Sequence, residues 1–483
     1  MIDTLPDNVL LIIFHLYQMD EVSQTGYFPW NWHRLAHVCR IWRHVIFASS
    51  HYLNLELLCT YGTPARKNLG YLPALPIVIT FPGFFEVEHS DGDDILAALE
   101  HPNRVRVVEL SIPYSLLGKM ATVMQEPFPV LTRLWLQSRN DGPMPALPDD
   151  FLGGYAPSLQ KICLDGIPFP AAPALLLSAR DLVDVDLRNI PSTGYISPEA
   201  MVTSLATLPR LKYLTLGFRW GSSYYPDRIR QPPITRTILP ALTTFDFNGL
   251  FEYLEDFVAQ VDAPQLNCLG IVYLGKGKGY WGEVEQYSDS SGEEEDSESE
   301  DEEEDNIDFQ IPQLCMFIDR SENLKISWFR RAFLEIQDYF VIIELDGGRS
   351  SFKLSIHNIR ISQVEVFSQI SCILSNVDRL FISSEFPGLG NTIRWLEVLH
   401  PFTAVKALSV QGEHSRRVAL ALKNVTGVWA AEVLPALELL CLENRSVSSV
   451  KQFIAARRNV GRPVTFISKG SEFRERLKLN ISG

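Results

Sequence analysis

One segment of the sequence approaches the spacing of a phosphate-binding loop. Gly270, Gly275 and Lys276 have the separation of the G-x-x-x-x-G-K motif, in which backbone N–H groups and the lysine hold phosphates. The next residue is Gly277, whereas magnesium coordination requires Ser or Thr there. The spacer, IVYL, is an apolar strand-like run, and no helix follows to present its N-terminus to a phosphate. The sequence therefore predicts a strand here and no nucleotide or other cofactor.

Other residues that could bind a metal or act as nucleophiles also lack the partner residues that such sites require. His33 and His37 lie four apart, on one face of an expected helix, but no acid or cysteine completes a metal-ligand motif. The seven cysteines form no C-x-x-C pair, and no G-x-S-x-G elbow occurs. We expect hydrogen-bonded or surface histidines, buried thiols and no metal site. A repeat-domain enzyme, with a triad assembled from distant positions, is one alternative.

The acidic charge of the chain is concentrated in one segment. The 483 residues carry a net charge of −15, and 14 of the 58 acidic residues lie in 285–308, which contains no Lys or Arg. The rest is nearly neutral and has no basic patch, so nucleic acid is not an expected partner. Such a run repels itself and buries nothing, which predicts a disordered insertion. Four serines in it have an acid three residues on, as acidophilic kinases prefer: Ser290, Ser291, Ser297 and Ser299. A solvated spacer and a regulated partner-binding loop are the two interpretations.

The N-terminus predicts an apolar helix that needs a partner. It has no basic signal-peptide region, and its apolar run Val9 to Phe14 is too short to span a bilayer, so we expect a cytoplasmic or nuclear protein without membrane contact. Residues 5–17 predict a helix with apolar residues on nearly all sides. Residues 32–47 have helical apolar spacing and supply one partner face. The remaining apolar surface must meet the downstream domain or another protein.

This N-terminal segment resembles the F-box, a helical module that tethers ubiquitin-ligase substrate receptors to the adaptor of a cullin-RING complex. The resemblance rests on a leading Leu-Pro pair, an apolar run and a later Val-Cys-x-x-Trp. The residues that the resemblance assigns to adaptor binding are Leu5, Pro6, Leu10, Ile13, Phe14, Leu35, Val38, Cys39 and Trp42. The family also implies a helix break near Cys39, where periodicity alone predicts one continuous helix.

The sequence that follows, HRLAHVCRIWRHVIFAS and then LLCTYGTPARKNL, is similar to a large family of fungal F-box proteins from mushroom-forming species. Two departures from the F-box pattern are a longer link, Met19 to Asn31, and Ile12 at a commonly polar position. They support a second interpretation, in which the chain is an interaction scaffold acting outside a ligase or with a degenerate F-box.

A repeat runs through the remainder of the chain. The pattern L-x-x-L-x-L, or a β-branched or aromatic variant, starts at Val105, Leu131, Leu159, Leu182, Leu211, Leu242, Leu266, Val377, Val405 and Leu437. Its spacing is typical of leucine-rich repeats. Proline precedes a leucine by two residues at Pro129, Pro157, Pro209, Pro240, Pro264, Pro312 and Pro435. Because proline stops a helix and favours extended structure before it, each unit should run helix, stop, strand. A doubly wound α/β sheet is the alternative, and the pattern fades between Leu324 and Val377.

The pattern also predicts which strand side chains face away from the core. In each strand the Leu positions face inward, so the residues flanking the last Leu line the outer strand surface. We expect target binding at Trp135, Gln137, Asp165, Asp186, Arg188, Asp246, Asn248, Gln411 and Glu443. The sequence as a whole predicts an α/β protein with an all-helical F-box at 1–60 and a leucine-rich-repeat-like solenoid at 61–284 and 309–483, interrupted by the acidic insertion at 285–308. The expected function is a non-catalytic receptor whose partners are the adaptor, through it the cullin, and an unknown target protein.

Overall fold

The structure is a computed structural model of the 483-residue chain. It describes residues 5–25, 32–61, 65–81, 89–138, 146–169, 174–219, 235–274, 309–325, 329–337, 340–357, 362–383, 393–427, 429–443 and 447–469. The predicted acidic insertion and its serines lie outside these ranges. The chain forms two compact units, Met1–Ile196 and Ser197–Gly483. Among the described residues, no helix has the length and apolar character needed to cross a bilayer.

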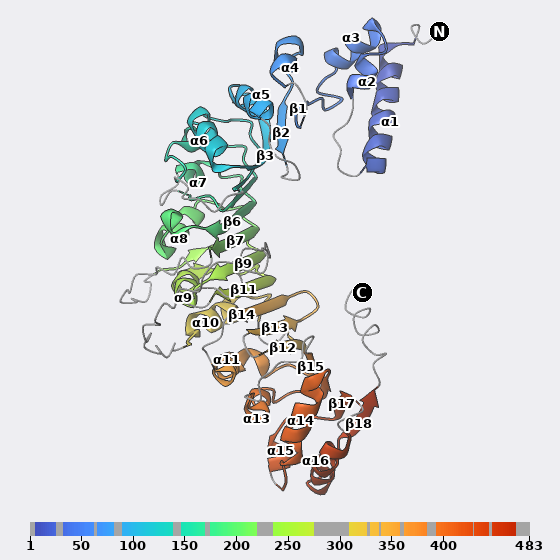
Figure 1. The fold of residues 1–483 in the computed structure, drawn as a ribbon, viewed down its shortest axis with the longest axis vertical. Coiled ribbons are helices and arrows are strands. Elements are labelled where there is room, and N and C mark those ends of the chain that lie inside the picture. Colours follow the sequence, from blue (N-terminus) through green and yellow to red (C-terminus); the bar gives the residue numbers. More distant parts are fainter. Residues whose placement is uncertain are drawn as a thin grey trace, which may run out of the picture. The chain divides into compact units, whose positions relative to one another are not determined.

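The first unit begins with three helices and continues with alternating strands and helices (Figure 1). Its elements are α1 Asp7–Thr25, α2 Trp32–Ala36, α3 Arg40–Ala48, β1 Leu57–Cys59, α4 Ala65–Tyr71, β2 Ile77–Phe81, α5 His89–Leu99, β3 Val105–Ile112, α6 Tyr114–Val123, β4 Arg133–Ser138, the 3-10 turn η2 Phe151–Gly154, β5 Lys161–Asp165, α7 Ala174–Ser178, β6 Asp184–Ile190 and the 3-10 turn η3 Ser192–Gly194.

Helices α1, α2 and α3 form a small module with its own core. Phe14 of α1 packs edge-to-face on Trp42 of α3, with ring centroids 5.0 Å apart. The segment predicted from periodicity as one helix is two, because Cys39 adopts an extended backbone and its Sγ accepts from the backbone N–H of Trp42 at 3.5 Å. This N-cap satisfies one of the free N–H groups at the start of α3. The break near Cys39, which the F-box resemblance implied, is thus present.

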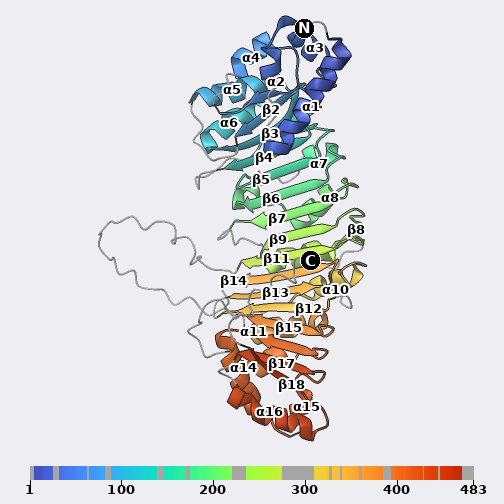
Figure 2. The ribbon, with the colours of Figure 1, turned by 90° about the vertical axis from the view of Figure 1, so that its right-hand side faces the viewer.

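Strands β1 to β6 run parallel and follow the order of the sequence (Figure 2). Helices α5, α6 and α7 lie on one side of these strands (Figure 1). Along β4 the side chains alternate, with Leu134 and Leu136 fully buried and Trp135 half-buried between them. A doubly wound sheet would reverse its strand order at a switch point, and this one does not. The first unit is therefore a stack of parallel strand-and-helix repeats, as in leucine-rich-repeat proteins.

The second unit continues the alternation. Its elements are α8 Pro198–Leu205, β7 Tyr213–Phe218, β8 Thr237–Ile238, β9 Thr244–Gly249, α9 Phe251–Ala259, β10 Val261–Asp262, β11 Cys268–Leu274, α10 Pro312–Arg320, β12 Arg331–Ile336, β13 Phe340–Asp346, β14 Ser351–His357, α11 Gln363–Gln369, α12 Ser371–Leu374, β15 Arg379–Ser383, α13 Trp395–Leu399, β16 Ala407–Val410, α14 Glu413–Lys423, α15 Trp429–Glu432, β17 Leu439–Glu443, α16 Val447–Asn459 and β18 Thr465–Lys469.

The repeat is interrupted where its sequence pattern fades. The order of the main-sheet strands in this unit is β7-β9-β11-β14-β13-β12-β15-β16-β17-β18, so β12, β13 and β14 appear in reverse. Strand β13 runs antiparallel to both neighbours, while β14 is parallel to β11 and β12 is parallel to β15. A three-strand meander therefore takes the place of regular repeat units within this sheet.

The predicted repeat positions match the strands. Nine of the ten predicted starts lie two residues before a strand, the tenth, Val105, begins one, and all ten side chains are at most 2% exposed. Six of the seven prolines precede a strand. Pro312 is the exception, because it is the first residue of α10. The first turn of a helix tolerates proline, whose missing N–H would have no partner there. The prediction of a helix stop at Pro312 was wrong.

The described residues on either side of 275–308 meet at one aromatic cluster. Tyr273, near the end of β11, stacks on Phe251 with ring centroids 4.4 Å apart. Phe309, directly after residue 308, packs edge-to-face on the same Phe251 at 4.7 Å. Beyond it, buried Glu255 of α9 accepts from the backbone N–H groups of Gln313 and Leu314, at 2.9 and 2.8 Å, and so caps α10. These contacts hold together the end of β11 and the chain that begins at Phe309.

We predict that deleting residues 286–306 changes the free energy of unfolding by less than about 1 kcal/mol, because loop closure costs only about 0.6 kcal/mol per doubling of length. Phe309→Ala, in contrast, should cost about 3 kcal/mol, since this ring is 2% exposed. Urea denaturation of the three proteins measures both changes. A loss on deletion as large as that of Phe309→Ala would contradict the prediction.

A buried arginine fastens the end of the second unit. Arg457 of α16 is 1% exposed and donates to the backbone carbonyls of Ala430 at 3.0 Å, Leu437 at 3.0 Å and Pro435 at 3.4 Å. Its guanidinium thus joins α16 to α15 and to the turn before β17. A buried carbonyl that loses its donor costs about 1–3 kcal/mol.

We predict that Arg457→Leu lowers the free energy of unfolding by about 3 kcal/mol, because it leaves several buried carbonyls without a donor. The neighbouring Arg458 is exposed, so Arg458→Leu serves as the matched control and should shift stability by less than about 0.5 kcal/mol. Hydrogen exchange of α15 and α16 should accelerate only in the first variant. Equal effects of the two substitutions would show that the carbonyl contacts do not matter.

Candidate functional site

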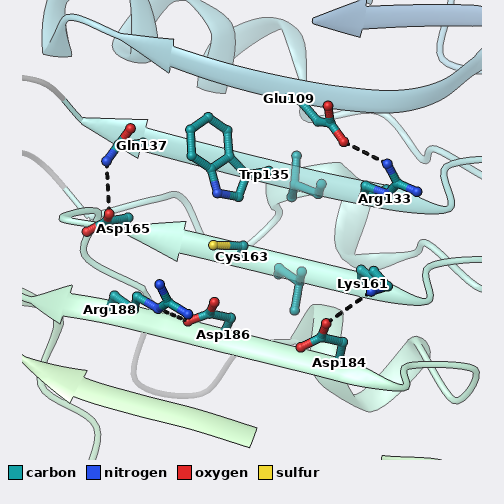
Figure 3. A pocket seen from close by; sticks show the side chains of 12 residues that line it. Glu109, Arg133, Trp135, Gln137, Lys161, Cys163, Asp165, Asp184, Asp186 and Arg188 are labelled. Carbon is teal, nitrogen blue, oxygen red and sulfur yellow. Dashed lines mark hydrogen bonds and ion pairs between the residues drawn. The ribbon is translucent and has the colours of Figure 1, made fainter. Parts of the chain in front are cut away.

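The outer face of strands β3 to β6 carries a pocket of about 370 Å³ (Figure 3). Five of the nine predicted target-binding residues line it: Trp135, Gln137, Asp165, Asp186 and Arg188. Parallel in-register pairing brings them together. Trp135 lies opposite Cys163, which lies opposite Asp186, and Gln137 lies opposite Asp165, which lies opposite Arg188. The strand alternation predicted from the sequence is therefore confirmed for these five positions.

Ion pairs and hydrogen bonds hold the polar side chains of this pocket in place. Ion pairs link Arg133 to Glu109 at 2.8 Å, Lys161 to Asp184 at 3.3 Å, and Arg188 to Asp186 at 2.8 Å. A second row runs across the strands: Ser111 donates to Gln137, Gln137 donates to Asp165 at 3.0 Å, and Asn189 donates to the other Asp165 oxygen at 2.6 Å. Fixed side chains lose less entropy on binding than free ones, so this surface is preorganised.

The centre of the pocket is lined by three half-buried side chains, Trp135, Cys163 and Asp186. The Trp135 indole lies between the strands that carry Glu109 and Cys163 (Figure 3). Burial raises the pKa of the Asp186 carboxyl, although the Arg188 guanidinium opposes this shift. Burial also raises the pKa of the Cys163 thiol, and the Asp186 carboxylate adds to the effect. Cys163 therefore stays a neutral thiol rather than a nucleophilic thiolate. The pocket offers an indole framed by oriented charges, which suits recognition of a protein surface.

Some pocket residues were not predicted from the sequence. They are Glu109, Arg133, Leu134, Lys161, Ile162, Cys163 and Asp184. Glu109 flanks the last apolar position of the repeat that starts at Val105, so the same rule would have found it. Cys163 flanks Leu164 and follows from the rule as well. Arg133, Lys161 and Asp184 lie on the same face of their strands, two positions before Trp135, Cys163 and Asp186.

The other four predicted target-binding residues lie in the second unit and do not line this pocket. Asp246 and Asn248 are both on β9, and the Asp246 carboxylate lies directly over Gly270 of β11. Glu443 is occupied locally: its carboxylate accepts from the backbone N–H of Gly412 at 3.0 Å, next to Gln411. The Glu443 carboxylate, at the end of β17, is thus held against the residue that precedes α14. The pocket thus brings together five of the nine residues, and target binding by the full set stays a prediction.

The N-terminal module carries a second candidate surface. Six of the sixteen large hydrophobic side chains that are exposed among the described residues lie here: Ile12, Ile13, Leu16, Val38, Ile41 and Tyr52. On α1, Ile12, Ile13 and Leu16 span an arc of roughly 100°, beside the side of the helix that carries the buried Leu10 and Phe14. This helix thus has one apolar face in the module core and a second one facing outward.

The residues assigned to adaptor binding divide between the core and the surface. Ile13, Val38 and Pro6 are exposed, and Leu5, Leu35, Cys39 and Trp42 are half-buried. Leu10 and Phe14 are fully buried, so their assignment is corrected. They contact the module's own core and cannot present a surface to an outside protein without unfolding it.

The described residues also include Gly270 of the phosphate-loop-like segment and His33 of the histidine pair. Gly270 lies within β11, and its carbonyl-side neighbours continue the strand, so the glycine is not in a phosphate-binding turn. Burial, and to a lesser degree His37, lowers the pKa of His33. Within the residues that the structure describes, no group of three or more His, Cys, Asp or Glu side chains is placed to hold a metal ion.

Comparison with known proteins gives a distant structural similarity. The structure is similar to a leucine-rich repeat-containing protein, LegL7 from Legionella pneumophila, with 10% sequence identity and a TM-score of 0.29 over 80% of this chain and 89% of that chain. No family model matches the sequence, and no curated protein matches it. The repeat architecture rests on the strand order, register and burial described above.

Proposed function

We propose that this chain is a non-catalytic substrate receptor of a cullin-RING ubiquitin ligase. Its N-terminal module would dock the ligase adaptor, and the pocket on β3 to β6 would bind the target protein. The observation that carries the proposal is the concentration of exposed apolar side chains on α1, Val38 and Ile41. Soluble proteins rarely leave such a concentration uncovered.

The F-box resemblance adds the identity of the partner. Ile13 and Val38 belong both to the residues that match the F-box pattern and to the exposed apolar set. The pocket residues of β3 to β6 belong to neither. Two surfaces of different chemistry, one apolar and one with oriented charges, fit a protein that joins two different partners. Holding the target near the ubiquitin-charged enzyme raises the effective concentration of its lysines, so binding alone promotes the reaction.

Co-purification of the tagged full chain with proteasome inhibition tests the proposal against the alternatives. A receptor should recover the adaptor and cullin together with a further protein that accumulates only under inhibition. A scaffold should recover a partner without adaptor or cullin, in amounts that inhibition does not change. Recovery of the adaptor alone, with no inhibitor-dependent protein, would contradict the receptor function while leaving adaptor docking intact.

A further inference from the structure

Two of the seven cysteines form a thiol pair in the second unit. Cys315 lies in α10 and Cys372 in α12, and the two side chains lie close enough for each thiol to shift the pKa of the other. The Cys315 Sγ also lies 3.7 Å from the backbone carbonyl of Gln369, which ends α11. Cys372 is exposed, whereas Cys315 is partly buried behind it. The sequence predicted buried thiols; of the seven, Cys59 is buried, five are half-buried and Cys372 is exposed, so this prediction is corrected.

The surroundings make Cys372 the more acidic thiol. The adjacent Cys315 thiol, together with the backbone N–H groups of Ile373 and Cys372, lowers the pKa of Cys372 to about 7. Partial burial and the Asp319 carboxylate act in the opposite direction. The neighbouring Cys372 and burial raise the pKa of Cys315. At neutral pH Cys372 is therefore partly thiolate, and Cys315 holds its proton beside it.

Other cysteines with altered acidity behave differently. Burial raises the pKa of Cys59 to about 12, with Asp94 and Asp91 adding to the shift. Burial and Asp186 keep the Cys163 thiol protonated. An exposed thiolate with a second thiol in contact is the arrangement found at redox-sensitive cysteines, where one sulfur reacts and its neighbour resolves the product.

We propose that Cys372 and Cys315 form a reversible disulfide when the chain meets a peroxide. The Cys372 thiolate attacks one peroxide oxygen, an S–O bond forms, the O–O bond breaks, and the leaving oxygen takes up a proton and departs as water or alcohol. The Cys315 sulfur then attacks the Cys372 sulfenic acid. The S–S bond forms, the S–O bond breaks, and the Cys315 proton leaves with the hydroxyl as water. The two thiols are oxidised and the peroxide is reduced.

The disulfide would join α10 to α12 across the reversed strands β12 to β14. Helix α10 is already fastened to α9 and β10, because Arg320 pairs with Asp262 at 2.6 Å and Glu255 caps its first turn. A disulfide between α12 and this fixed helix would form a covalent loop that contains the meander β12 to β14. Regular repeat packing is absent in this meander. Oxidation should therefore slow local opening of β12 to β14.

The test is treatment of the reduced full-length protein with hydrogen peroxide, followed by alkylation and mass spectrometry. We expect one linked peptide pair containing Cys315 and Cys372, a loss of about 2 Da from the intact mass, and recovery of both thiols with dithiothreitol. Cys315→Ser should stop at a sulfenic acid on Cys372 that dimedone traps. Cys372→Ser should remove the link without producing a sulfenic acid at Cys315.

A matched control is Cys163→Ser, which should form the link at the wild-type rate because Cys163 is on another unit. At neutral pH, iodoacetamide should modify Cys372 at least about 10-fold faster than Cys59 in the wild type, following their thiolate fractions. The proposal is overturned if Cys372 remains free after peroxide treatment, or if either cysteine pairs instead with one of the other five.

Discussion

The double variant Ile13→Asp with Val38→Asp should bind the ligase adaptor at least about 100-fold more weakly than the wild type. The Ile13 side chain is 40% exposed and the Val38 side chain 56%. Neither belongs to the module core, which contains Leu10 and Phe14, so the module should stay folded. Burying two unpaired carboxylates in an apolar interface should cost more than about 2.8 kcal/mol, which corresponds to 100-fold in affinity.

The matched control for this experiment is Leu177→Asp. Leu177 is 51% exposed on α7, outside the N-terminal module, so this variant adds a charge at a comparable apolar position and should bind the adaptor normally. Circular dichroism and thermal melting check that all three proteins fold alike. If the double variant and the control bind equally well, the exposed apolar face is not the docking surface.

Reversing the charges of Asp186 and Arg188 should reduce target recovery at least about 10-fold while leaving the adaptor bound. Exchanging the two residues, as Asp186→Arg with Arg188→Asp, keeps an ion pair within β6 but inverts its orientation beside Trp135. Electrostatic complementarity decides which partner is accepted, and like charges brought face to face cost several kcal/mol. The Arg188 side chain is exposed but the Asp186 side chain is half-buried, so the exchange should cost on the order of 1 kcal/mol of stability.

The second unit offers a matched control for this exchange. Lys353 of β14 and Glu344 of β13 form an exposed ion pair at 2.7 Å, and Lys353→Glu with Glu344→Lys reverses it in the same way. Quantitative mass spectrometry of proteins co-purified under proteasome inhibition compares the variants. Equal loss of the target from both exchanges would show that net surface charge, rather than the pocket, governs binding.

The repeat could be predicted from the sequence because its cause is local. A leucine at each inward position of a short strand is needed wherever stacked units share a core, so Leu134 and Leu136, for example, identify β4 without knowledge of the whole fold. The same alternation placed Trp135 and Asp186 on the outer face. Five residues of the pocket followed from it, since parallel strands in register bring equivalent positions together.

What failed depends on contacts that no local pattern encodes. Strands β12 and β13 alternate buried and half-buried residues just as the parallel strands do, so their antiparallel pairing is invisible in the sequence. Proline suits both the end of one helix and the first turn of another, and this ambiguity explains Pro312. Leu10 and Ile13 are both apolar, and only the packing of α1 shows that one is core and the other surface.

Direct binding of the purified full-length chain to the purified adaptor subunit tests the central claim most directly. Isothermal titration calorimetry of the two proteins should show a one-to-one complex with submicromolar affinity and a negative heat-capacity change, because apolar surface on α1 and near Val38 is buried. Absence of binding by a folded wild-type chain at tens of micromolar would contradict the account, since its exposed apolar face would then have to serve some other partner.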